Sequence, residues 1–208
     1  MFKKIKMEKK PLETLLKGSL YIFIGAIIAS LFGYLIRLFL VNTLTQQEFG
    51  LFYAVFNFVF LFLFFRDLGL YSSFVKFIVD FNVKNKIKEI KSVIVGTLYL
   101  QIGISLFFVI LFWIGSNFLA THYFKIEEAK WLLRIFSLYF LLSIIIRFIP
   151  SFFQSFKKKI YLSINEPLKN IITFSLITTL FYFGLGIYSP VLAYLLVNII
   201  LLIIFIKP

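Results

Sequence analysis

Three arginines and one aspartate lie within runs of sequence that are otherwise apolar. Arg37 stands near the end of the first run and Arg147 near the end of the fourth, while Arg66 and Asp67 are adjacent in the second. A charge at the centre of a membrane helix costs at least ~2.5 kcal/mol, so such residues usually face the interior of a helical bundle. A guanidinium keeps its charge and donates hydrogen bonds in a fork, which suits a phosphate. The three arginines are therefore candidate binding residues for an anionic group.

Each charged residue also has a purely structural interpretation. Arg66 and Asp67 could pair with neighbouring side chains that only satisfy their charges. Arg37 and Arg147 lie close to the ends of their runs, so either side chain could extend to the membrane surface. Glu166 is a candidate coupling site for a proton or cation, but it lies near a predicted surface and could be solvated. Asp67 and Glu166 are thus candidate ion-pair partners or candidate sites that couple transport to a proton or cation.

The composition requires lipid as the solvent for most of the chain. The 208 residues are 61% hydrophobic, with a mean hydropathy of +0.98, whereas soluble domains are ~45–50% apolar. The absence of cysteine excludes disulfides, thiolate metal sites and a cysteine nucleophile. The net charge of +13 is carried by short segments between apolar runs, so we expect no nucleic-acid binding, which needs a soluble basic domain.

The apolar runs predict an all-α, polytopic integral membrane protein, with one six-transmembrane-helix bundle over residues 1–208. About 20 apolar residues are needed to span a bilayer. The predicted helices cover residues 18–41, 49–81, 93–114, 129–153, 161–183 and 191–206. The second run is longer than one span, so we expect a kink near Asp67-Leu68-Gly69, because glycine costs ~1 kcal/mol relative to alanine in a helix.

Two stripes of side chains orient the charged residues. Small residues at every fourth position of the first helix allow a neighbouring helix to approach closely; they are Gly25, Ala29 and Gly33. Arg37 follows at the next step of four, so its side chain should face protein or a cavity. In the fourth helix, polar residues recur at the same spacing and point Arg147 to the interior; they are Tyr139, Ser143, Arg147 and Ser151.

The lysines divide the predicted loops into two classes. The lysine-rich segments are residues 1–17, 82–91 and 154–159. On the opposite side, residues 42–48 form a short turn without lysine or arginine, and residues 116–128 form the longest loop. By the positive-inside rule the lysine-rich segments are cytoplasmic. The sequence therefore predicts a multi-pass protein of the cytoplasmic membrane with both termini in the cytoplasm.

Three short blocks give the chain a resemblance to a known family. They are L-x-x-x-E-F-G-L-F at Leu44–Phe52, D-L-G-L at Asp67–Leu70 and F-V-K-F-I at Phe74–Ile78. With Arg37 before them, their order and spacing resemble those of the Wzx-like polysaccharide biosynthesis flippases of the multidrug/oligosaccharidyl-lipid/polysaccharide superfamily. The chain departs from the family pattern at Thr45-Gln46, where Gly-Pro is usual.

The resemblance implies a transporter of lipid-linked oligosaccharides or polysaccharide precursors. Such transporters have two six-helix lobes of the MATE/MOP type, and this chain resembles the N-terminal one. The implied partners are the lipid-linked glycan, the bilayer and a second six-helix lobe; no cofactor or metal is expected. In this interpretation Arg37, Arg66 and Arg147 bind the (pyro)phosphate head group, while Asn57, Gln101 and Thr173 offer hydrogen bonds to the sugars.

Three other functions stay open. A multidrug or cation extruder of the same superfamily would need an intramembrane carboxylate and a less cationic cavity. A membrane-embedded enzyme would need a catalytic base or a large outer loop, and the sequence offers no metal cluster or nucleophile–base pair; we therefore expect no enzymatic activity. A non-transporting fragment is the third possibility, because six helices form one wall of a cavity. Either a second copy or missing downstream helices would supply the other wall.

Overall fold

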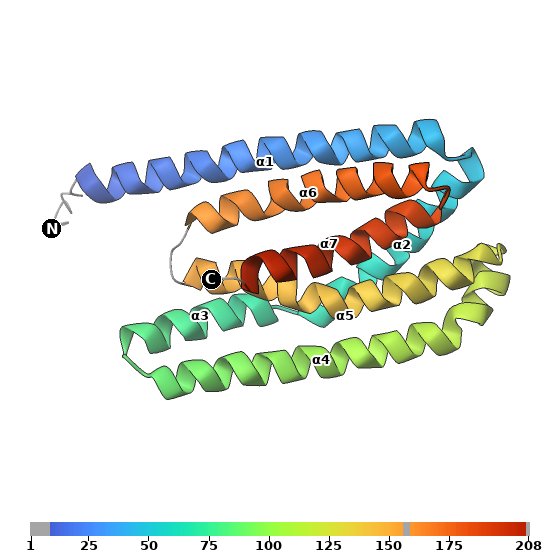
Figure 1. Ribbon diagram of the computed structural model, residues 1–208. Coiled ribbons are helices and arrows are strands. Elements are labelled where there is room, and N and C mark those ends of the chain that lie inside the picture. Colours follow the sequence, from blue (N-terminus) through green and yellow to red (C-terminus); the bar gives the residue numbers. More distant parts are fainter. Residues whose placement is uncertain (1–8, 156–158, 207–208) are drawn as a thin grey trace, which may run out of the picture.

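The computed structural model describes residues 9–155 and 159–206, and these residues form helices joined by short turns. In chain order the helices are α1 (Lys9–Thr43), α2 (Gln46–Asp67), α3 (Leu70–Val83), α4 (Ile87–Phe118), η1 (Leu119–Phe124, a π-helical segment), α5 (Glu128–Ser155), α6 (Lys159–Tyr182) and α7 (Tyr188–Ile206). They run back and forth along one long bundle, in which α3 continues in the direction of α2, and α1 begins and α7 ends toward the same end (Figure 1). The all-α prediction is confirmed.

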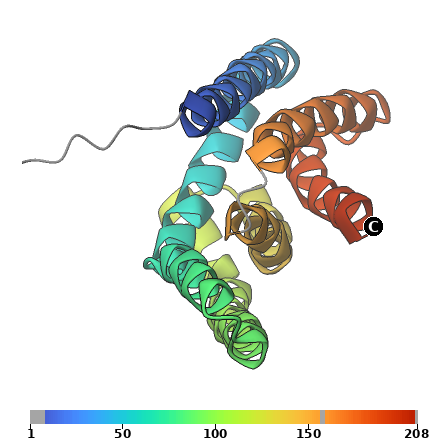
Figure 2. The same cartoon turned by 90° about the vertical axis from the view of Figure 1, so that its left-hand side faces the viewer.

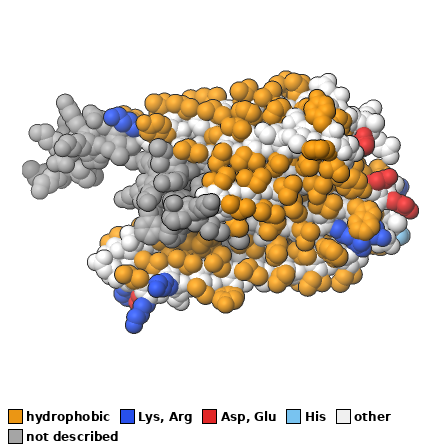
Figure 3. Space-filling view, in the orientation of Figure 1, with side chains coloured by type: hydrophobic (Ala, Val, Ile, Leu, Met, Phe, Trp, Pro, Cys, Tyr) orange, Lys and Arg blue, Asp and Glu red, His pale blue; other side chains and the backbone are white. Residues whose placement is uncertain are grey.

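The outer surface of the bundle is that of a membrane protein. Among the described residues, three segments are long and apolar enough to cross a bilayer, Leu16–Thr43, Gln46–Val83 and Ile87–Phe124, and Tyr188–Ile204 is a shorter apolar helix. Hydrophobic side chains cover the middle of the face in Figure 3, whereas charged side chains gather toward its two ends. The chain is therefore a polytopic membrane protein, as predicted; six spans stay a prediction.

Helix α5 is the centre of the bundle. It contacts α2, α3, α4, α6 and α7. Seen along the bundle, α2, α3 and α4 lie on one side of α5, while α6 and α7 lie on the other (Figure 2). A helix that meets neighbours on all sides must bury polar as well as apolar residues, and α5 buries Ser137, Ser143 and Ser151 among its apolar side chains. Polar groups on α5 are thus placed inside the protein.

The predicted interruption of the second apolar run is confirmed. Helix α2 ends at Asp67, Leu68 (φ 33°) and Gly69 (φ 82°) both adopt the left-handed conformation, and α3 then begins at Leu70. The interruption separates two hydrophobic clusters. Residues of α2 pack in the main core, whereas Phe74 and Ile78 of α3 form a smaller cluster with Phe148 of α5.

The turn predicted at residues 42–48 is shorter than expected, because helices extend into it from both sides. Helix α1 continues to Thr43, and α2 begins at Gln46. Thr45 and Glu48 form a capping box, in which the Thr45 side chain accepts a hydrogen bond from the backbone N–H of Glu48 (3.3 Å) and Glu48 accepts one from the backbone N–H of Thr45 (2.9 Å). Two otherwise free backbone donors are satisfied in this way.

The prediction of a loop at residues 116–128 was wrong for most of this segment, because residues 116–124 are helical. Helix α4 extends from Ile87 to Phe118, beyond the predicted 93–114, and the chain continues as η1 to Phe124. The polar side chains of this segment can lie on a helix, because their hydroxyl groups donate hydrogen bonds to backbone carbonyls of the same helix. Ser116 donates to the Trp113 carbonyl (2.9 Å), and Thr121 donates to the Asn117 carbonyl (3.0 Å).

The small-residue stripe of α1 packs against α6, as its spacing predicted. A Cβ atom built on Gly25 would collide with the backbone carbonyl oxygen of Ser163, so only glycine permits this approach. One turn further on, the Asn170 side chain donates a hydrogen bond to the Ala29 carbonyl (2.8 Å). The two helices are thereby joined by backbone contact and by a polar bond across their interface.

Candidate functional site

A cavity of about 460 Å³ opens between α2–α3, α5 and α6. Hydrophobic rings contribute one part of its wall, including Phe60 and Tyr139. The polar residues that line it include Asp67, Ser143, Arg147, Asn165, Glu166 and Lys169. We refer to this space as the polar cavity. It brings together three of the predicted site residues, Asp67, Arg147 and Glu166, which come from three different helical segments.

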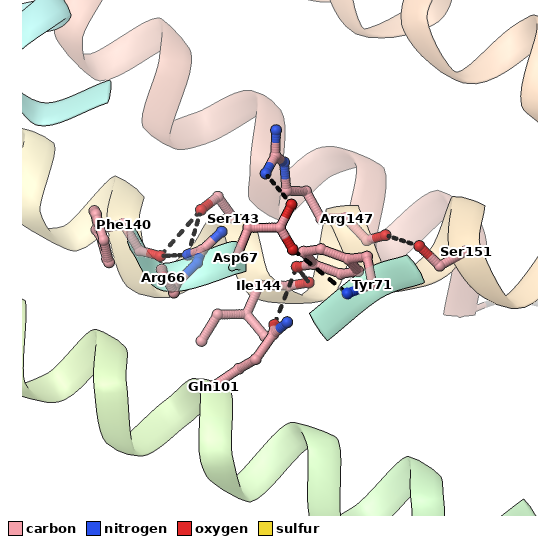
Figure 4. Close-up of polar contacts among 9 residues, drawn as sticks. All are labelled: Arg66, Asp67, Tyr71, Gln101, Phe140, Ser143, Ile144, Arg147 and Ser151. Atoms are coloured by element: carbon pink, nitrogen blue, oxygen red, sulfur yellow. Dashed lines mark hydrogen bonds and ion pairs between the residues drawn. The ribbon is translucent and has the colours of Figure 1, made fainter. Parts of the chain in front are cut away.

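Arg147 and Asp67 form an ion pair across the polar cavity, from α5 to the end of α2. Their closest atoms, Arg147 Nη1 and Asp67 Oδ2, are 3.7 Å apart, and the side chains are 50% and 32% exposed. Figure 4 shows the guanidinium above the carboxylate, with Tyr71 beside both. The other carboxylate oxygen, Oδ1, accepts a hydrogen bond from the Tyr71 backbone N–H (3.4 Å). The pair is loose, because its atoms are 3.7 Å apart and both side chains are partly exposed. Exposed ion pairs contribute only ~0–1 kcal/mol to stability.

A second loose pair lies on α6. Lys169 Nζ is 3.9 Å from Glu166 Oε2, and Glu166 is 61% exposed. Lys169 was missed by sequence reasoning as a site residue, although its spacing of three from Glu166 places the two side chains side by side on a helix. With Asp67 and Arg147, the lining therefore contains two cations and two carboxylates. The expected excess of arginine over carboxylate is not found in the lining itself.

Arg66 is fully buried and lies outside the lining of the polar cavity. Its Nη1 donates hydrogen bonds to the backbone carbonyl of Phe140 and to Ser143 Oγ (3.0 Å). Its guanidinium carbon also lies 4.9 Å from the centre of the Phe140 ring. Arg66 thus joins α2 to α5 and does not reach the cavity that contains Arg147.

Gln101 is also buried behind the polar cavity. Its side-chain oxygen accepts a hydrogen bond from the Tyr71 hydroxyl (3.0 Å). The same hydroxyl lies 3.5 Å from the Ile144 carbonyl oxygen (Figure 4). Tyr71 was missed by sequence reasoning because an isolated tyrosine in an aromatic-rich chain gives no signal. Thr173, which was predicted to offer a sugar contact, is buried and donates to the Lys169 carbonyl (2.7 Å).

The structure leaves Arg37 and Asn57 away from the polar cavity. Both residues are exposed, and neither belongs to its lining. The guanidinium carbon of Arg37 lies 5.8 Å from the centre of the Tyr53 ring on α2. Arg37 follows Gly33 by four positions on α1, but its side chain is exposed and does not enter the interior of this lobe. That Arg37 faces protein or a cavity therefore stays a prediction, because its side chain is exposed on the surface of this lobe.

A second cavity, of about 340 Å³, lies where η1 leads into α5. Its lining includes Thr121, Glu127, Glu128 and Trp131, and none of the predicted site residues. The described residues also contain no group of three acidic or histidine side chains that could hold a metal ion. The candidate site is thus the polar cavity.

A polar cavity with paired charges, set within an apolar helical bundle, defines the class of the protein: a membrane protein with a hydrophilic site among its helices. The chain belongs to the polysaccharide biosynthesis protein family, whose model matches residues 15–207. The family prediction is thereby confirmed.

One relative of the chain is a longer membrane protein. The uncharacterized membrane protein MJ1068 of Methanocaldococcus jannaschii is 25% identical over 204 residues, which cover 93% of this chain and 40% of the relative. The chain thus spans less than half the length of the relative that it matches. No solved structure matches the chain.

Proposed function

We propose that this chain is one lobe of a flippase that moves lipid-linked oligosaccharides or polysaccharide precursors across the cytoplasmic membrane. The observation that carries the proposal is the polar cavity, in which a half-exposed guanidinium, Arg147, faces open space inside an apolar bundle. A lipid-linked glycan carries a phosphate or pyrophosphate next to its sugars, and this head needs a lined passage through hydrocarbon. Membership of the polysaccharide biosynthesis protein family supports the same conclusion.

The loose ion pairs explain how a cavity with balanced charge can accept an anion. Arg147 and Asp67 are separated by 3.7 Å and are partly hydrated, so the pair can open at little cost. A phosphate offers the guanidinium a bidentate, charge-assisted contact that is stronger than this pair. The head group would therefore take the place of Asp67 on Arg147, with Lys169 on the facing helix as a second cation.

The proposal includes a second six-helix lobe, on the same chain or on another. The chain covers 40% of its relative MJ1068, and the residues that line the polar cavity all come from helices of this one lobe. Rocking of this lobe against its partner would expose the cavity to each side of the membrane in turn. In this arrangement both termini of the chain lie in the cytoplasm.

A second candidate function is extrusion of a cation or cationic drug. The observation that favours it is the presence of Asp67 and Glu166 in the same cavity. Intramembrane carboxylates are typical coupling sites for protons and cations. We rank this function second, because Lys169 and Arg147 stand beside the two carboxylates and oppose a bound cation.

Translocation in reconstituted vesicles tests the proposal. The complete transporter is assayed with a pyrophosphate-linked glycolipid and with a neutral glycolipid of the same sugar and chain length. We expect the pyrophosphate-linked lipid to cross at least about tenfold faster than the neutral one, since charge-assisted hydrogen bonds contribute ~1.5–3 kcal/mol. Equal rates for the two lipids would contradict phosphate recognition, and transport of a lipophilic cation alone would support the second candidate.

A further inference from the structure

Arg66 is a charged side chain whose charge is not balanced by a carboxylate contact. It is 0% exposed, and its Nη1 makes the two hydrogen bonds to α5 described above. Its Nε and Nη2 have no hydrogen-bond partner among the described residues. Of the four ion pairs within that part of the chain, none includes Arg66. Its sequence neighbour Asp67 instead pairs with Arg147.

Two further buried side chains with unpaired polar atoms come from α4. Gln101 and Ser105 lie one turn apart on the same face of this helix, and both are 0% exposed. The Gln101 oxygen is occupied by Tyr71, which leaves its Nε2 without a hydrogen-bond partner in the described structure. The Ser105 hydroxyl likewise has no partner there.

These groups converge on the same stretch of α5. Arg66 of α2 reaches the Phe140 carbonyl, and the Tyr71 hydroxyl, which holds Gln101, lies at the Ile144 carbonyl one turn further on (Figure 4). On α4, Phe108 lies one turn from Ser105 and packs on the Phe140 ring, with centroids 5.3 Å apart. The side chains that carry the unpaired atoms, Arg66 of α2 and Gln101 of α4, are therefore linked to two carbonyls that lie one turn apart on α5, Arg66 directly and Gln101 through Tyr71.

The chemistry of these free groups selects an anion. Arginine has only donors, the amide nitrogen of glutamine donates two hydrogens, and a serine hydroxyl donates one. A buried charge that lacks a partner is strongly unfavourable in a medium of low polarity. We propose that a small monovalent anion, with chloride as the physiological ion, binds between α2, α4 and α5 and is held by Arg66, Gln101 and Ser105.

This site is distinct from the polar cavity. Arg66 and Gln101 are fully enclosed and do not line that cavity, so a lipid head group has no direct access to them. The bound anion neutralises Arg66 and ties together three helices close to the interruption between α2 and α3. The inference does not depend on the proposed function, because it concerns the stability of the lobe.

Thermal unfolding of the purified protein tests the inference. The protein in detergent is heated in sodium chloride, sodium bromide or sodium gluconate at equal ionic strength. Because a ligand that binds only the folded state stabilises it by mass action, we expect Tm to rise by a few degrees in either halide and to saturate with concentration. An equal Tm in the three salts would overturn the proposal and would leave water as the partner of these donors.

Matched variants locate the effect. Gln101→Met keeps the volume of the side chain while removing the amide donor, so the halide-dependent rise in Tm should shrink or vanish. Arg134→Gln is the control, since Arg134 lies elsewhere on α5 and bonds to Ser116 (3.1 Å); its halide dependence should equal that of the unaltered protein. A full halide effect in Gln101→Met would contradict the assignment, as would its loss in Arg134→Gln. Anomalous scattering from bromide between the three helices would confirm the site directly.

Discussion

Replacing Arg147 by alanine is expected to weaken binding of a pyrophosphate-bearing lipid by roughly 10- to 100-fold, because hydrogen bonds to charged groups contribute ~1.5–3 kcal/mol. Arg147 is the cation that α5 presents to the polar cavity, and half of its side chain is exposed there. Binding can be measured by calorimetry with a short-chain isoprenyl pyrophosphate and the purified protein. The experiment needs no second lobe, because it follows binding and not transport.

Substitution of the neighbouring carboxylate, Asp67, serves as a control, because it should not weaken lipid binding. Asp67→Asn removes the negative charge that competes for Arg147, so the same lipid should bind equally well or more tightly. Arg147→Lys keeps the charge but loses the forked pair of donors, and its affinity should fall between those of the unaltered protein and Arg147→Ala. If Arg147→Ala binds with unchanged affinity, the cation of the polar cavity does not recognise the head group.

Replacing Gly25 by alanine is expected to lower the free energy of unfolding by ~1–3 kcal/mol, the usual cost of overpacking. The added Cβ atom would collide with the backbone carbonyl oxygen of Ser163, and a backbone atom cannot turn aside as a side chain can. Helix α1 would have to move away from α6 and strain the hydrogen bond between Asn170 and Ala29. The midpoint of thermal unfolding in detergent measures the loss.

Gly33 is the matched control for Gly25, since both belong to the same stripe of α1. A Cβ atom at Gly33 would have the Asn170 side-chain nitrogen as its nearest neighbour, at 3.8 Å, which is ordinary contact. Alanine is favoured over glycine in a helix by ~1 kcal/mol, so Gly33→Ala should be neutral or stabilising. Equal destabilisation by the two substitutions would show that the close approach of α1 and α6 does not depend on Gly25.

The sequence predicted the helices because hydropathy and lipid thickness leave few alternatives for an apolar run. It also predicted the interruption after Asp67, where the left-handed Gly69 follows a charged pair. The segment around Thr121 was misassigned to a loop because its polar residues suggest exposure to water. Their hydroxyl groups instead bond to carbonyls one turn earlier, so polarity and helix coexist there.

The grouping of the charged residues could not be derived from the sequence. The pair between Arg147 and Asp67 joins residues that are far apart in the chain, and a single sequence carries no signal of such contacts. Helical spacing places a residue on a face but does not state what covers that face. For this reason Arg37 shared the stripe of Gly25 and yet is exposed, whereas Arg66, for which spacing made no prediction, is fully buried.

Protection of a single cysteine is the most direct test of the claim that the polar cavity binds a phosphate-bearing lipid head. The chain contains no cysteine, so Ser151→Cys introduces one thiol into the lining of the polar cavity, and Thr121→Cys introduces one into the distant cavity beside η1. The rate of labelling by a small methanethiosulfonate reagent is measured with and without an isoprenyl pyrophosphate. We predict that the lipid slows labelling at position 151 and leaves the rate at position 121 unchanged. Labelling at position 151 that proceeds at the same rate with saturating lipid would contradict the account.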